Sequence, residues 1–237
     1  MSSHRLHSED SPSLAPGREV ELSIDKLALG GAGLARFEGM AVFVERGLPG
    51  SRVLARITAA KKRHAEAEVL RVLAPSPHAA EPFCPHFGSC GGCTHQDLDY
   101  AEQLRWKHLQ VQETLARLGN LGEAAADKVL PILASPETRH FRNKMEFAFA
   151  GGAGERLSLG LRPCGAADGL LDVTTCFLQS PQSAEIVNAA RDFCRTTGFP
   201  AYDPAREIGL WRHLVVREAK RSEEHTSELS HVALSRM

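Results

Sequence analysis

The chain has 237 residues, enough for one large domain or two small ones, each with its own core. Apolar residues make up 43% and charged residues 24%, which is the composition of a soluble globular protein. The sequence has no apolar stretch typical of a secretory signal and no run near the ~20 residues of a membrane span. We therefore predict a cytoplasmic protein with no membrane partner. The net charge of −1 does not by itself indicate a polyanionic partner.

Residues 1–14 contain no apolar run, and we interpret them as a disordered leader. Residues 15–74 alternate apolar and polar positions in short stretches separated by glycine-rich turns. This pattern predicts five strands and a small barrel of the oligonucleotide-binding kind. The segment GGAGLA (30–35) and the later GGAGE (151–155) each lead into another strand rather than a helix. We therefore interpret both as hairpin turns and not as phosphate-binding loops.

Basic residues gather in the second half of the predicted barrel. Between Glu45 and Val72 there are seven basic and three acidic residues, an excess of +4. Such a stripe suits contact with phosphates, although a solvated strand face would look the same. We expect three of these residues to form a loop that contacts RNA: Lys61, Lys62 and Arg63. Arg36, on an earlier predicted strand, is a weaker candidate for an RNA contact.

A proline-rich linker (74–82) ends the barrel, and residues 75–220 then mix helical and strand patterns. Apolar spacing predicts a helix within 100–122 and strands within 140–150, 156–162, 169–178 and 209–220. Ser180 is a suitable N-cap for a second helix that runs to Gly198. The predicted fold class is thus α+β, with a β-barrel followed by a mixed central domain, and Trp106 and Trp211 are expected in cores.

The segment CPHFGSCGGCTHQ (84–96) places Cys84, Cys90 and Cys93 at the spacing C-x5-C-x2-C. Zinc sites usually combine two paired arms, and this sequence offers only one such pair. Three near cysteines and one distant cysteine are a common way to hold a 4Fe-4S cluster. Three buried cysteines without a metal, a zinc-ribbon-like binding module and a radical S-adenosylmethionine enzyme are the alternatives. The last usually has C-x3-C-x2-C and an alternating βα pattern, which this sequence lacks.

Three cysteines are candidates for the fourth ligand. Cys194 lies on the apolar side of the second predicted helix, and we expect a core thiol. Cys164 lies in a polar hairpin, where we expect it to be exposed. Cys176 ends the stretch LLDVTTC (170–176) of the predicted strand, and a rigid element of this kind could bring it back to the cluster, so we choose Cys176. We assign His86 and His95 to the surroundings of the cluster, and Gln96 is a candidate for orienting the loop.

The order of these elements resembles the N-terminal part of the bacterial RNA uracil-5-methyltransferases that carry a TRAM domain and an iron-sulfur cluster. The resemblance rests on CPHFGSCGGCTHQ, HFRNKMEF, DVTTCFLQSP and GLWRHLVVRE, and it is nearest to enzymes that modify 23S ribosomal RNA. It implies that Cys176 is the fourth ligand and that Arg142 and Lys144, on one face of a strand, meet the RNA backbone. The implied partner is therefore RNA, most simply ribosomal RNA, bound by a monomer.

In that family a C-terminal Rossmann-like domain binds S-adenosylmethionine and methylates the uracil at C5 through a cysteine nucleophile. We see no such segment here, so we expect a truncated protein that binds RNA and transfers no methyl group, its cluster being structural. Residues 221–237 show no helix or strand pattern and resemble the translation of a sequencing adapter. We expect this tail to be non-native.

Overall fold

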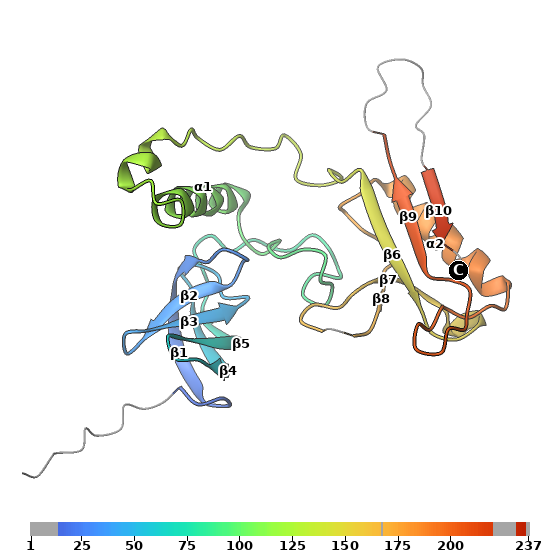
Figure 1. Ribbon diagram of the computed structural model, residues 1–237, viewed down its shortest axis with the longest axis horizontal. Coiled ribbons are helices and arrows are strands. Elements are labelled where there is room, and N and C mark those ends of the chain that lie inside the picture. Colours follow the sequence, from blue (N-terminus) through green and yellow to red (C-terminus); the bar gives the residue numbers. More distant parts are fainter. Residues whose placement is uncertain (1–13, 167, 220–230, 236–237) are drawn as a thin grey trace, which may run out of the picture. The chain divides into compact units, whose positions relative to one another are not determined.

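The computed structural model describes residues 14–166, 168–219 and 231–235. They form two compact units, one containing residues up to 81 together with 97–133, and the other containing 82–96 and the residues from 134 onward (Figure 1). None of the helices in these described ranges has the length and apolar character of a membrane span. The predicted leader lies outside the described residues except for Leu14, which is buried in a hydrophobic core.

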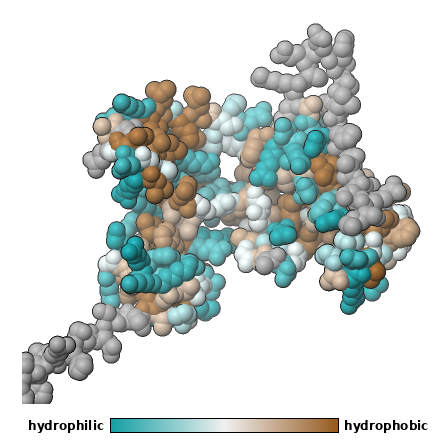
Figure 2. All heavy atoms as spheres, in the orientation of Figure 1, coloured by the Kyte–Doolittle hydropathy of each residue, from teal (hydrophilic) through white to brown (hydrophobic). Residues whose placement is uncertain are grey.

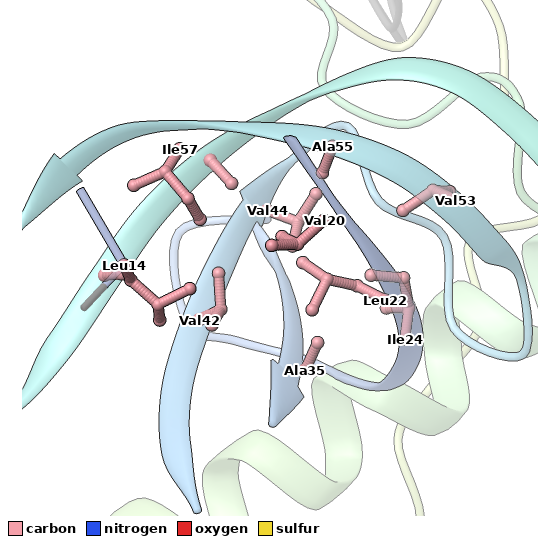
Figure 3. Close-up of a cluster of buried hydrophobic side chains, with 12 residues drawn as sticks. Leu14, Val20, Leu22, Ile24, Ala35, Val42, Val44, Val53, Ala55 and Ile57 are labelled. Atoms are coloured by element: carbon pink, nitrogen blue, oxygen red, sulfur yellow. The ribbon is translucent and has the colours of Figure 1, made fainter. Parts of the chain in front are cut away.

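The first unit contains the predicted five-stranded barrel. Its strands are β1 (Glu19–Leu27), β2 (Gly33–Phe37), β3 (Met40–Glu45), β4 (Arg52–Ala60) and β5 (His64–Ala74). They close in the order β1-β2-β3-β5-β4, and all pairs are antiparallel except β3 with β5. Alternate residues point inward because the side-chain period of a strand is two, and they fill the core in Figure 3. The barrel prediction is confirmed, and GGAGLA is a β1–β2 hairpin turn.

Helix α1 (Tyr100–Arg117) also belongs to the first unit, followed by the short helix η1 (Glu123–Lys128). Trp106 of α1 is buried in a small cluster with Leu27 and Leu98, so its predicted core position is confirmed. The Gln110 amide donates to the Leu27 carbonyl at 2.9 Å. The helix is thus fastened to the end of β1 by apolar burial and by a side-chain hydrogen bond.

The second unit is a five-stranded antiparallel sheet with a helix packed on one face. The strands are β6 (Lys144–Ala150), β7 (Ser158–Leu161), β8 (Leu171–Asp172), β9 (His213–Arg217) and β10 (His231–Ser235), in the order β10-β9-β6-β7-β8. A short helix η2 (Gly154–Arg156) lies in the β6–β7 turn, as expected for GGAGE. Helix α2 (Pro181–Thr196) begins as predicted, since the Ser180 hydroxyl accepts from the Ser183 amide.

The core of this unit lies between α2 and the sheet. Met145, Phe147 and Phe149 of β6 pack with Val187 and Cys194 of α2. Other members come from β7, β9 and the segment before β9, and Trp211 is among them as predicted. The opposite face carries the polar residues of β6 and β9 together with Ala148, Ala150 and Val215, so the fully buried apolar residues of the two strands lie on one face.

Two strand predictions are wrong. The sequence after Arg221 shows no strand pattern, yet residues 231–235 form β10 against the edge of β9. Edge pairing depends on backbone hydrogen bonds, which any suitable extended segment can supply. The predicted strand 169–178 shrinks to Leu171–Asp172 because side chains of α2 take the next carbonyls: Arg191 donates to Val173 and Asn188 donates to Thr174.

Candidate functional site

Four cysteines line one pocket of the second unit. Cys84, Cys90 and Cys93 come from the loop 84–96, and Cys176 comes from the loop between β8 and α2. The pocket measures about 350 Å³, including space open to solvent. Cys176 was expected at the end of a strand, but it lies four residues beyond β8. Tertiary structure therefore brings together the same four cysteines that the sequence selected.

Hydrogen bonds fix the shape of the 84–96 loop. The Cys84 amide donates to Gln96 Oε1 at 3.1 Å, so the side chain at the end of the motif closes the loop, as expected for Gln96. The Cys90 amide donates to the His86 carbonyl at 2.8 Å. Gly91 donates to the Arg162 carbonyl at 3.0 Å, which ties the loop to the segment after β7. These bonds satisfy the backbone of a loop that has no regular secondary structure.

The two glycines of the motif allow close approach. A Cβ on Gly91 would lie 3.1 Å from the Arg162 carbonyl oxygen, and one on Gly92 would lie 3.4 Å from Cys90 Sγ. The Gly92 amide is 3.4 Å from the same sulfur and donates to it. Backbone amides of this kind stabilise thiolates and cluster sulfides.

The thiols are partly desolvated. Burial raises the pKa of Cys90, and the Gly92 amide opposes this shift. Burial also raises the pKa of Cys176, opposed by the amides of Leu178 and Gln179. The protonated thiol is therefore favoured in the absence of a cation, and a bound metal would replace the protons.

Thiols are the donor type that soft metals and iron-sulfur clusters take. Four thiols surround the pocket, and His86, which also lines it, has a buried Nε2 without a hydrogen-bond partner in the described structure. A sulfide or thiolate acceptor in the pocket would satisfy that nitrogen. Across the described ranges, no group of three or more His, Cys, Asp or Glu side chains is arranged to hold a metal ion.

The two remaining cysteines do not line the pocket, although Pro163, next to Cys164, pairs with Cys90. Cys164 is exposed, as predicted, and its amide donates to the Ser89 carbonyl at 2.8 Å. Cys194 is fully buried in the core under α2, and burial raises its pKa to about 11. Its sulfur is a packing group, as predicted.

The candidate RNA contacts of the barrel lie on its surface. Lys61, Lys62 and Arg63 form the exposed β4–β5 loop. Lys61 pairs with Glu66, whereas Lys62 and Arg63 have no ion pair to another described residue. Arg56 of the basic stripe is also paired: its guanidinium lies 3.3 Å from the Glu19 carboxylate and 3.6 Å from that of Glu68. Arg36 is exposed on β2 and donates to the Gly39 carbonyl.

The candidate contacts of the second unit lie near the start of β6. The expectation that Arg142 and Lys144 share a strand face is wrong, because β6 begins at Lys144. The backbone before it pairs elsewhere: the Arg142 amide donates to the Leu178 carbonyl at 2.8 Å. Sequence reasoning missed two exposed neighbours, Phe141 and Arg217. Phe141 could have been found because it is the first residue of the FRNK segment. Arg217 could have been found because it is a cation near the end of the last predicted strand.

The barrel also matches a known domain. Residues 14–70 match the family model described as the TRAM domain.

The whole chain has longer homologues. It is 47% identical over 207 residues to an uncharacterized RNA methyltransferase of Nitratidesulfovibrio vulgaris, an alignment that covers 87% of this chain and 43% of that protein. It is 38% identical to an uncharacterized RNA methyltransferase of Clostridium tetani, covering 88% of this chain and 45% of the relative. The TRAM-containing chain thus spans less than half the length of these relatives.

One solved structure has a similar fold. The crystal structure of the Pyrococcus abyssi tRNA (uracil-54, C5)-methyltransferase in complex with S-adenosyl-L-homocysteine superposes with a TM-score of 0.60. The match covers 90% of this chain and 44% of that chain at 22% identity. At this identity, the comparison establishes the fold alone.

Proposed function

We propose that this chain is the RNA-binding and cluster-bearing part of an S-adenosylmethionine-dependent RNA (uracil-5-)-methyltransferase. The observation that carries the proposal is the 47% identity to a protein named as an RNA methyltransferase, over 87% of this chain. The TRAM domain and the fold of the Pyrococcus abyssi enzyme support it. The methyl-transfer chemistry would then belong to the part of the relatives that this sequence does not cover.

The proposed substrate is 23S ribosomal RNA, in which the enzyme would form 5-methyluridine. The support is the cysteine motif of residues 84–96, which by resemblance marks the branch that modifies ribosomal RNA and is typically absent from the tRNA-modifying branch. The TRAM barrel would supply phosphate contacts through its exposed cations, Lys62 and Arg63 above all. The chain would act as a monomer.

We propose that Cys84, Cys90, Cys93 and Cys176 hold a 4Fe-4S cluster. The pocket lined by four thiols, the Gly92 amide at Cys90 Sγ and the unsatisfied His86 nitrogen support this assignment. The bound cluster would have a structural role, because it would join the 84–96 loop to the segment that precedes α2.

Two measurements test the proposal on the full chain. Anaerobically purified protein should contain iron and sulfide and show a broad absorbance near ~400 nm, whereas a colourless protein containing zinc would overturn the cluster assignment. A fluorescent 23S ribosomal RNA fragment should bind, and unlabelled ribosomal fragments should compete better than tRNA. If unlabelled tRNA competed as well as the ribosomal fragments, the proposed preference for ribosomal RNA would be wrong.

A single-turnover assay tests whether methyl transfer lies outside this chain. With labelled S-adenosylmethionine and the RNA fragment, this chain should produce no methylated uridine. Methylated uridine would place catalysis within these 237 residues and refute that part of the proposal.

A further inference from the structure

A short basic segment leads into β6 and carries an exposed aromatic ring. Between Thr138 and Met145 there are three cations and no acidic residue. Within this segment, Phe141 is 52% exposed, although phenylalanine is usually buried. An apolar ring that stays open to water among cations is the arrangement found where proteins stack on nucleic-acid bases.

The backbone around Phe141 is fixed on both sides. The His140 amide donates to the Phe177 carbonyl at 2.7 Å, and the Arg142 amide donates to the Leu178 carbonyl at 2.8 Å. His140 also has a φ of 55°, in the left-handed region, and its ring nitrogen Nδ1 bonds to the Gln179 carbonyl. Phe141 is therefore presented from an anchored turn, and binding a base would cost little further ordering.

A pair of like charges lies beside this turn. Lys144 at the start of β6 is directly opposite Arg217 at the end of β9. Both are exposed on the sheet face away from the core, because the neighbouring Met145 and Val216 point into the core. Like charges that face each other across a sheet are destabilising.

Among the residues that the structure describes, few anions offset these charges. Lys144 lies 4.0 Å from Glu146, an exposed pair that contributes little. Arg217 has no ion pair or side-chain hydrogen bond to any other described residue. Figure 2 shows hydrophilic side chains gathered over the end of the sheet where Figure 1 draws the start of β6. A bound phosphate would relieve the repulsion between the two cations.

We infer that this surface binds an unpaired stretch of RNA, with a base stacked on Phe141 and phosphates contacting Arg142, Lys144 and Arg217. The inference rests on the proposed RNA-binding function and names where and how one strand is held. Phe141 and Lys144 are three positions apart in the sequence, at most about 11 Å of chain, so one RNA strand can reach both. The RNA must be unpaired there, because bases in a duplex do not expose a face for stacking.

Binding of a labelled single-stranded 23S ribosomal RNA fragment to the full chain, followed by fluorescence anisotropy at several salt concentrations, tests the inference. F141A should lower the affinity about 5- to 150-fold at every salt concentration. F141W should restore binding, because it keeps a stacking ring. The matched control is F193A, which removes an aromatic ring that is 59% exposed on α2, and it should bind as the wild type does.

The charge contact has its own readout. R217Q should lower the slope of log affinity against log salt by about 0.7, the change for one phosphate contact on a single strand. R206Q, in the turn before β9, is the control and should leave the slope unchanged. If F141A and R217Q bind like their controls, or if loss of binding is as large for duplex RNA, the inference is wrong. If the wild-type chain binds no RNA, the proposed function fails and the inference fails with it.

Discussion

The replacement C176S tests the link between the two loops of the pocket. Cys176 lies 83 positions after Cys93, yet both line the same pocket. By the relation for covalent cross-links, closing a loop of that length removes about 4.5 kcal/mol of chain entropy from the unfolded state. We therefore expect the free energy of unfolding of anaerobically purified C176S to be about 4 kcal/mol below that of the wild type.

C164S is the matched control, because it removes an exposed thiol of the same unit that does not line the pocket. Iron and sulfide content, absorbance near ~400 nm and anaerobic urea unfolding should be measured for both variants. C164S should match the wild type in all of them, whereas C176S should lose iron and absorbance. Full iron content and stability in C176S, or their loss in C164S, would refute the assignment of the fourth ligand.

Three further predictions concern groups that hold the fold. R191M should lower the free energy of unfolding by about 2–4 kcal/mol, because it removes the donor to the buried Val173 carbonyl and the 2.7 Å ion pair between Arg191 and Asp172; a loss under about 1 kcal/mol in urea unfolding would contradict this. The hydrogen bond from Arg105 lowers the pKa of Glu102, so E102Q should cost about 0.5–1 kcal/mol at pH 7, and the difference from wild type should vanish as pH falls through the lowered pKa; a pH-independent difference would refute it. Iodoacetamide at pH 8 should modify Cys164 and spare Cys194, whose pKa of about 11 leaves about one thiolate in a thousand; equal labelling by mass spectrometry would refute it.

The cysteine pocket shows which parts of the candidate site local sequence patterns can predict. The spacing of Cys84, Cys90 and Cys93 singled out one cysteine loop, and the Gln96 side chain, expected to orient that loop, accepts a hydrogen bond from the Cys84 amide. Cys176 lines the same pocket as these three cysteines, but the strand that was expected to carry it does not reach it. The strand that should carry it ends at Asp172, because α2 side chains far along the chain take the carbonyls that would continue the ladder.

At the surface near β6, the residues could be selected from the sequence, but their arrangement could not. Arg142 and Lys144 could be selected from the sequence, but their shared strand face could not be tested without the partner of residues 140–143. That partner is the segment 177–179, and its hydrogen bonds turn the chain before β6 begins. The pairing of Lys144 with Arg217, which suggests a phosphate site, depends on the register between two strands more than sixty positions apart.

The sequence by itself determined the barrel, the two main helices, the hairpin turns and the ligand loop. Each depends on period, capping or glycine content within a few residues, so each is written locally. Tertiary structure alone decided where β8 ends, that residues 231–235 join the sheet, and which distant thiol lines the pocket. These outcomes depend on hydrogen-bond partners and cross-strand neighbours that are remote along the chain, and no local pattern specifies them.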